Sequence, residues 1–305
     1  MKKKALAIFL ISAMALSLCS CGYFSSSEEE EEEAEETETT ETEEDTGAFQ
    51  VYEATEQNQT TYSEADILSF ELVEMDTDSS SDYVIGVYEI TNGSSEDIDY
   101  LSVDFAYLDE EGNQLDTDAR YIDCQLSAGK WAVMKTYYSR DSSDDIPAEI
   151  EVTGYDYIMS DIRYSVDLQL EDFDYYTVSS DEDADFDSVN ILEFTLEDKG
   201  KTSSDSYQIE VDIENSGEID VTYVSFRMAY FDDDENYLTS DSRYTDNVIS
   251  PGNYATLNSY GSTDYTIGMY GIFEYSYELA EDDENGYNYY EINLQTQTVT
   301  ASHVD

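Results

Sequence analysis

The chain has 305 residues with 73 acidic and 12 basic side chains, and its formal net charge is −61 at pH 7. A field of this sign repels phosphate groups, so the composition excludes a protein that binds DNA or RNA. The only histidine is His303, close to the C-terminus, which argues against Ser-His-Asp and Cys-His catalytic sites and against His-based zinc sites.

The first 20 residues have the layout of a secretory signal peptide. Three lysines at positions 2–4 precede an apolar run over residues 5–18, which is shorter than the roughly 20 residues of a permanent membrane helix. The sequence LCSC then resembles a bacterial lipobox, with Cys21 as the residue that carries lipid. Cys19 is a rival acceptor, but it would place bulky Leu18 before the cleavage site. An ordinary signal peptide cut nearby is the other alternative.

Lipid attached to Cys21 predicts an extracytoplasmic protein anchored in the cell membrane. Each buried methylene group contributes about 0.8 kcal/mol, so two acyl chains give stable attachment. Residues 21–65 are rich in Glu, Thr and Ser and poor in apolar side chains. Such a segment cannot bury enough surface to fold, and we expect a disordered acidic stalk.

An internal repeat follows the stalk. The sequence YLSVDFAYLDEEGNQL over residues 100–115 matches YVSFRMAYFDDDENYL over residues 223–238, with an offset of 123 positions. The same offset relates DARYIDCQLSAGKW to DSRYTDNVISPGNY. The repeat predicts two homologous domains, residues 66–170 and 188–298, joined by an acidic linker over residues 171–187.

Within each repeat, apolar residues recur with a period of two. Residues 207–213 alternate Tyr, Ile, Val and Ile with Gln, Glu and Asp, and residues 101–107 show the same alternation. Turn sequences such as Asn92-Gly93 and Pro251-Gly252 separate these runs. Strands with one buried face predict an all-β protein, built from two tandem antiparallel β-sandwich domains.

The order of these pieces resembles FxLYD-type immunoglobulin-like domains of bacterial surface lipoproteins. The pieces are ITNGS, FAYLDEEGN and SAGKWAV in the first copy and IENSG, MAYFDDDEN and SPGNYAT in the second. Both copies depart from the pattern. Met228 replaces the Phe in the second copy, and the expected Leu-Tyr pair is Tyr-Leu in the first copy and Tyr-Phe in the second. The resemblance implies an immunoglobulin-like sandwich at the cell surface and implies no chemistry.

Few residues of the chain are candidates for catalysis. The sequence contains neither GxGxxG nor GxxxxGK[ST], so no phosphate-binding loop is predicted. Acidic residues are so numerous that a pair at glycosidase spacing carries no information. Cys124 is a lone cysteine, which is typical of a small buried side chain, and its counterpart in the second repeat is Asn247. We therefore expect a protein that is not an enzyme and needs no cofactor.

Calcium is the one cofactor that the sequence leaves open. Calcium takes six to eight oxygen ligands, and each repeat has an acidic hairpin that clusters such oxygens. The alternative is an ordinary solvated turn, in which Asp, Asn and Gly are favoured. The linker holds a second cluster at Asp181, Glu182, Asp183, Asp185 and Asp187. The hairpin candidates are Asp109, Glu110, Glu111 and Asn113, and in the second repeat Asp232, Asp233, Asp234 and Asn236.

Trp131 and its counterpart Tyr254 follow the glycine turns, where an exposed ring is able to stack on a sugar or a protein. The alternative, which we favour, is that each is the first core residue of the next strand. The sequence thus predicts a binding or interaction module, with an envelope protein or polymer as partner. A structural spacer and an accessory subunit of an envelope enzyme or transport complex are the alternatives.

Overall fold

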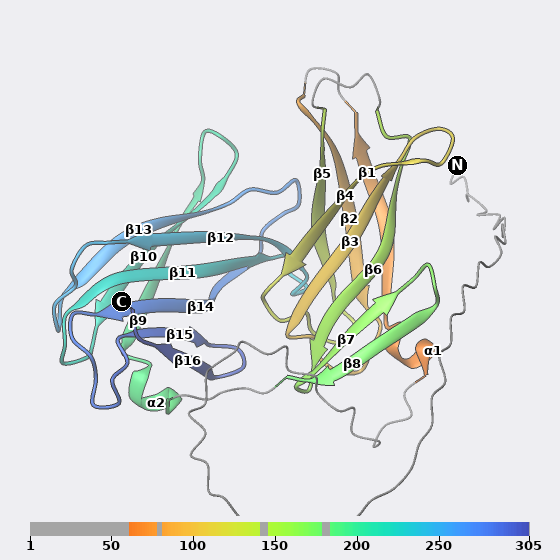
Figure 1. Ribbon diagram of the computed structural model, residues 1–305. Helices are drawn as coiled ribbons and strands as arrows, with labels where there is room; N and C mark the ends of the chain where they lie inside the picture. Colours follow the sequence, from red (N-terminus) through yellow and green to blue (C-terminus); the bar gives the residue numbers. More distant parts are fainter. Residues whose placement is uncertain (1–60, 78–80, 141–145, 179–183, 305) are drawn as a thin grey trace, which may run out of the picture. The chain divides into compact units, whose positions relative to one another are not determined.

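The computed structural model describes residues 61–77, 81–140, 146–178 and 184–304 (Figure 1). The signal peptide, Cys21 and residues 21–60 of the predicted stalk lie outside the described residues, and those expectations stay predictions. Among the described residues, no helix is long and apolar enough to cross a membrane.

The first repeat consists of a helical turn followed by eight strands (Figure 1). Its elements are α1 (Tyr62–Ala65), β1 (Leu68–Asp76), β2 (Tyr83–Asn92), β3 (Tyr100–Leu108), β4 (Gln114–Ile122), β5 (Trp131–Ser139), β6 (Glu149–Met159), β7 (Ile162–Asp167) and β8 (Asp172–Thr177).

The second repeat has the same elements in the same order. They are α2 (Phe186–Val189), β9 (Leu192–Lys201), β10 (Tyr207–Asn215), β11 (Val221–Phe231), β12 (Tyr237–Thr245), β13 (Tyr254–Gly261), β14 (Met269–Leu279), β15 (Tyr289–Asn293) and β16 (Thr298–Ser302).

Both repeats are antiparallel β-sandwiches with one topology. In the first repeat, β1-β2-β5 form a three-stranded layer and β4-β3-β6-β7-β8 a five-stranded layer; the second repeat pairs β9-β10-β13 with β12-β11-β14-β15-β16. A parallel bridge between Tyr237 of β12 and Ala132 of β5 links a sheet of each repeat. The prediction of an all-β protein with tandem sandwich domains is confirmed, and the layers are compatible with immunoglobulin-like domains.

The boundaries of the repeats differ from the predicted domain boundaries. α1 lies inside the predicted stalk and buries Ala65 against the first core. β8 occupies part of the predicted linker and pairs with β7. Its sequence is acidic, but Phe173 and Tyr175 alternate with the aspartates and pack against the core. The overall charge of this segment concealed a short strand with one apolar face.

The two cores confirm the period-two pattern. In β10, Ile209, Val211 and Ile213 have no exposed surface, while the residues between them are partly exposed. Full burial of a side chain of this size contributes about 1.5–3 kcal/mol. Tyrosine supplies much of the aromatic core, and the largest fully buried side chains include Tyr107, Tyr157, Tyr230 and Tyr277.

The buried tyrosines are compatible with an apolar core because their hydroxyl groups have partners. Tyr157 donates a hydrogen bond to the carbonyl oxygen of Ala65 at 3.1 Å, and Tyr277 donates to the carbonyl oxygen of Val189 at 2.8 Å. These bonds satisfy the buried hydroxyls and tie each helical turn to its five-stranded layer.

A buried asparagine is preserved in both repeats. Asn92 donates through Nδ2 to the carbonyl oxygens of Glu96 and Leu126, and Asn215 donates to the carbonyl oxygens of its own repeat in the same way. The amide donates to backbone carbonyl oxygens that have no partner in the hydrogen-bonding ladder of the sheet. The Asn-containing turn seen in the sequence is therefore a structural feature.

Cys124 is buried, and burial raises the pKa of its thiol well above the ordinary value. The thiolate is the reactive form, so we expect Cys124 to react with iodoacetamide on the order of a hundredfold more slowly in the folded protein than in guanidinium. Peptide mapping by mass spectrometry measures the labelling of this residue alone. Equal labelling rates in both states would contradict the buried position.

Candidate functional site

The predicted hairpin sites are closed by their own backbone. The Asp109 carboxylate accepts hydrogen bonds from the backbone NH groups of Glu111 and Asn113 at 2.9 and 2.7 Å and from the Asn113 side chain at 2.8 Å. The hydrogen bond from the Asn113 side chain is the largest contribution that lowers the pKa of Asp109. The carboxylate therefore orders the turn.

The hairpin of the second repeat repeats this arrangement. Asp232 accepts from the backbone NH groups of Asp234 and Asn236 at 2.9 Å, and from the Asn236 side chain. Among the described residues there is no group of three or more His, Cys, Asp or Glu side chains placed to hold a metal ion. Calcium binding stays a prediction, and the linker positions 181–183 lie outside the described residues.

Trp131 and Tyr254 have different surroundings although their positions are equivalent. The Trp131 ring is partly buried, and its centroid lies 5.6 Å from that of Tyr265. Tyr254 has 69% of its surface exposed. The two rings therefore do not form a duplicated contact surface, and Tyr254 alone remains exposed for a partner.

A cluster of polar and aromatic side chains is duplicated instead. In the first repeat, Asp118 of β4 accepts hydrogen bonds from Arg120 at 2.7 Å, from the Thr136 hydroxyl at 2.9 Å and from the Tyr137 backbone NH at 3.2 Å. Tyr107 donates to the Thr136 hydroxyl, and the Arg120 guanidinium lies 4.9 Å from the centre of the Tyr137 ring.

The second repeat holds the same cluster 123 positions later. Asp241 is paired with Arg243 at 2.9 Å and accepts from Ser259 at 2.9 Å and from the Tyr260 NH at 2.8 Å. Tyr230 donates to Ser259 at 2.7 Å, and burial raises the pKa of this phenol to about 12. The cluster ties β4 to β5 and β12 to β13, and so fastens the two sheets of each sandwich at one edge.

Sequence reasoning missed this cluster, although the signal was present. DARY and DSRY are aligned in the repeat, and arginine is rare in this chain. Because the cluster is the same in both repeats and joins their sheets, we interpret it as structural. The features that distinguish the repeats are better candidates for a specific function.

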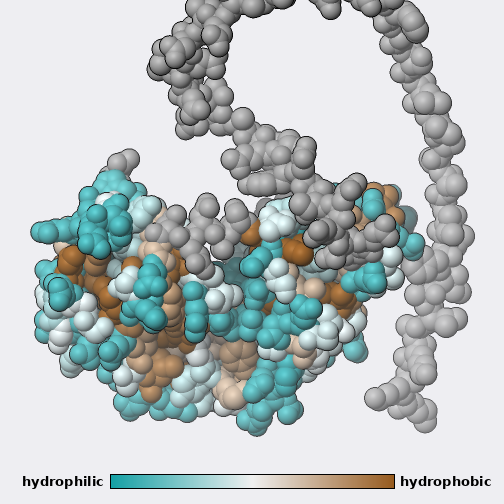
Figure 2. Space-filling view, turned by 90° about the horizontal axis from the view of Figure 1, so that it is seen from below, coloured by the Kyte–Doolittle hydropathy of each residue, from teal (hydrophilic) through white to brown (hydrophobic). Residues whose placement is uncertain are grey.

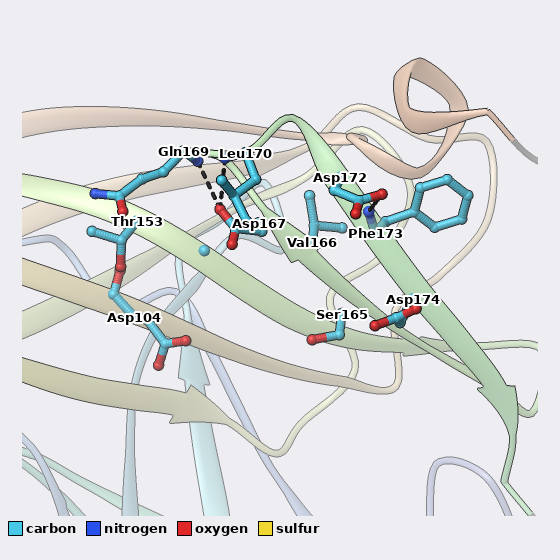
Figure 3. A pocket seen from close by; sticks show the side chains of 11 residues that line it. Asp104, Thr153, Ser165, Val166, Asp167, Gln169, Leu170, Asp172, Phe173 and Asp174 are labelled. Atoms are coloured by element: carbon cyan, nitrogen blue, oxygen red, sulfur yellow. Dashed lines mark hydrogen bonds between the residues drawn. The ribbon is translucent and has the colours of Figure 1, made fainter. Parts of the chain in front are cut away.

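One such feature is a hollow of about 410 Å³ on the five-stranded layer of the first repeat (Figure 3). Asp104 of β3, Gly154 of β6, Asp167 of β7 and Asp172 of β8 are consecutive partners in one row across this sheet. Figure 3 shows Asp104, Ser165 and Asp174 around the opening, while the Asp167 carboxylate turns to the NH groups of Gln169 and Leu170, both at 2.9 Å.

Gly154 keeps the hollow open. A β-carbon at this position would lie 2.8 Å from the carbonyl oxygen of Val166, which is closer than real side chains allow. A larger residue would push the strands apart as well as fill the space.

The equivalent row of the second repeat contains a basic side chain. Its residues are Arg227, Glu274, Asn293 and Thr298 in consecutive partner positions. Arg227 lies 3.4 Å from Glu274 and is also paired with Asp123 of the first repeat. The row in the first repeat has three carboxylates and no basic side chain.

The local surroundings of Asp104 change its titration. Burial raises the pKa of Asp104 above its ordinary value, and the nearby charge of Asp156 raises it further. Arg163 does not offset this, because its guanidinium is paired with Asp156 at 2.6 Å. The residues that line the hollow include Asp104 and three further aspartates and no lysine or arginine.

The surface offers no single dominant apolar patch on the face shown in Figure 2. Hydrophobic side chains occur there in several groups separated by hydrophilic ones. This face gives no support for a partner held by one large apolar contact.

Comparisons with known proteins add little. No family model matches the chain, and no curated protein matches it. Among solved structures, red sea bream transglutaminase is similar to 72% of this chain, which covers 29% of that chain, with 11% sequence identity and a TM-score of 0.24. A similarity of this strength carries no argument about activity.

The duplicated cluster generates a stability prediction. Asp118→Asn removes the anion that pairs with Arg120, so we expect the free energy of unfolding to fall by about 1–3 kcal/mol. Urea unfolding followed by circular dichroism measures the change. Asp116→Asn, at an exposed position of the same strand, is the matched control and should have little effect. Equal effects of the two substitutions would contradict the role of the cluster.

The hollow generates a pH prediction. Because the pKa of Asp104 is raised in the folded state, its ionised form costs stability at pH values above that pKa. Asp104→Asn should therefore raise the unfolding temperature at pH 7. The gain should shrink as the pH falls through the raised pKa of Asp104 and vanish below the ordinary carboxyl range. A gain that grows at low pH would contradict this assignment.

Proposed function

We propose that this protein is a membrane-anchored extracytoplasmic lipoprotein that acts as a non-catalytic binding module. The observation that carries the binding role is the hollow of the first repeat. The two repeats share topology, buried asparagine and edge cluster, yet the row of the first repeat lines a hollow and has no basic residue, while the row of the second contains Arg227. Departures from local balance are typical of functional sites, where binding compensates for the cost.

A structural spacer is the rival proposal. A spacer needs only stability and solubility, and the second repeat meets both needs with a row in which Arg227 is paired with Glu274. The cost of partly burying the Asp104 carboxylate gives a spacer no advantage. An accessory subunit of an envelope complex is a special case of the binding module, in which the partner is another subunit.

The anchoring part of the proposal rests on the N-terminal sequence. The lipobox resemblance at Cys21 supports lipid attachment, and the resemblance to FxLYD-type domains supports a location at the cell surface.

Substitution of Cys21 tests the anchor. We expect Cys21→Ala to release the protein from the membrane fraction or to leave its precursor uncleaved, because the substituted residue has no thiol to acylate. Cell fractionation and the mass of the purified chain measure both effects. Normal processing with unchanged retention in the membrane would contradict lipid anchoring.

Photo-crosslinking in the producing cells tests the binding role. A benzoylphenylalanine at Asp174, beside the hollow, should give a discrete adduct with one partner. Thr300 holds the equivalent register position in the second repeat and is the matched control, and both positions are exposed. No adduct at either position, or equal adducts at both, would favour the spacer.

A further inference from the structure

We propose that the hollow of the first repeat binds a basic side chain, lysine or arginine, presented by a segment of a partner protein. This inference rests on the proposed binding function and names the chemistry of its ligand. It is carried by the shape of the hollow, by its charge and by the contents of the equivalent place in the second repeat.

The shape of the hollow suits an inserted side chain. Its volume of about 410 Å³ is in the range of small ligand sites. Leu170 lines it together with the polar groups, while the side chains of Val166 and Phe173 pack against the core on the other face of the sheet. Leu170 is exposed on 74% of its surface, which leaves it free to cover the aliphatic stem of a long basic side chain while the charged end reaches the carboxylates.

The charge of the hollow selects a cation. Asp104, Asp167, Asp172 and Asp174 line it without a basic residue, and Thr153 and Ser165 add hydroxyl groups that accept hydrogen bonds. A guanidinium or ammonium group donates several hydrogen bonds at once and would place a positive charge among carboxylates that have no basic residue beside them in the hollow. An anionic or purely apolar ligand gains nothing there.

The second repeat shows the completed version of the same place. Arg227 stands at the position equivalent to Asp104, and its guanidinium lies against Glu274, which stands at the position equivalent to Gly154. The guanidinium also lies 5.9 Å from the centre of the Phe273 ring. This sheet surface thus accommodates a guanidinium paired with carboxylates, and in the first repeat the cation must come from another molecule.

A metal ion fits the hollow less well than a basic side chain. A hard cation needs six to eight converging oxygen atoms. No three acidic side chains in the described part of the chain come together closely enough for that. Two of the carboxylates in the hollow are also committed, since Asp167 accepts from two backbone NH groups and Asp172 accepts from the Phe173 NH at 2.9 Å.

Fluorescence anisotropy with the full chain in detergent tests the proposal. The probes are labelled peptides GSGRGSG and GSGQGSG, which differ in one side chain. We expect the arginine peptide to bind about tenfold more tightly than the glutamine peptide, in line with charge-assisted hydrogen bonds. Asp104→Asn and Asp174→Asn should each weaken the arginine peptide about fivefold.

Two further variants make the test specific. Asp104→Arg places a cation from the chain itself in the hollow, as in the second repeat, and should abolish the difference between the peptides. Asp246→Asn makes the same change of charge at an exposed position of the second repeat and should leave binding unchanged. Circular dichroism of each variant checks that it folds.

Three results would overturn the proposal. Equal weakening by Asp246→Asn would mean general attraction to an acidic protein. Equal binding of both peptides would mean that the hollow does not distinguish a positively charged side chain from a neutral one. Displacement of the peptide by millimolar calcium, but not by magnesium, would mean an ion site. If any of these results is obtained together with a specific crosslink at position 174, the proposed binding function still holds. Only the proposal of a basic ligand is then rejected.

Discussion

Each repeat depends on burying one face of every strand between a three-stranded and a five-stranded layer. This constraint explains why isoleucine, valine and tyrosine recur at every second position of the strands. Burial between the two layers also determines which polar side chains can lie in the core. Asn92 and Asn215 are buried because their amides satisfy backbone carbonyls. Buried tyrosines such as Tyr157, Tyr88 and Tyr230 donate to the end of a helical turn, to a strand carbonyl and to a hydroxyl group.

The duplication of the sandwich makes it possible to separate structural from specific residues within one chain. Asp118, Arg120 and Thr136 recur as Asp241, Arg243 and Ser259, with nearly the same distances. A role common to both repeats, fastening one sheet to the other, explains their retention. The hollow beside Gly154 has no such counterpart, because Glu274 and Arg227 occupy its place in the second repeat. That asymmetry is the physical basis of the binding function proposed above.

The sequence predicted the fold class and the repeat well, because both depend on local patterns that a single chain displays. The period of two located β10 and β11, and the offset of 123 positions aligned the strands of the two repeats. β8 was missed because its aspartates dominate its composition, while Phe173 and Tyr175 supply its buried face. α1 was missed because a single turn that buries only Ala65 leaves almost no periodicity.

The site was less predictable than the fold. The hairpin aspartates were predicted as cation ligands because they are clustered in the sequence. The carboxylates of Asp109 and Asp232 instead accept hydrogen bonds from NH groups of their own turns. The hollow draws Asp104, Gly154, Asp167 and Asp172 from four strands, and their proximity follows from the register of the sheet. A register includes bulges, such as the one beside Asp104, that a sequence without structure does not reveal.

The central claim is that the first repeat holds uncompensated negative charge that a basic side chain neutralises. The most direct measurement is an NMR titration of the Asp104 carboxyl carbon in aspartate-labelled protein, assigned by comparison with Asp104→Asn, with and without the arginine peptide. The account predicts a raised pKa in the free protein that moves down when the peptide binds, because a nearby cation stabilises the carboxylate. An ordinary pKa in the free protein, or a raised pKa that the peptide leaves unchanged, would contradict it.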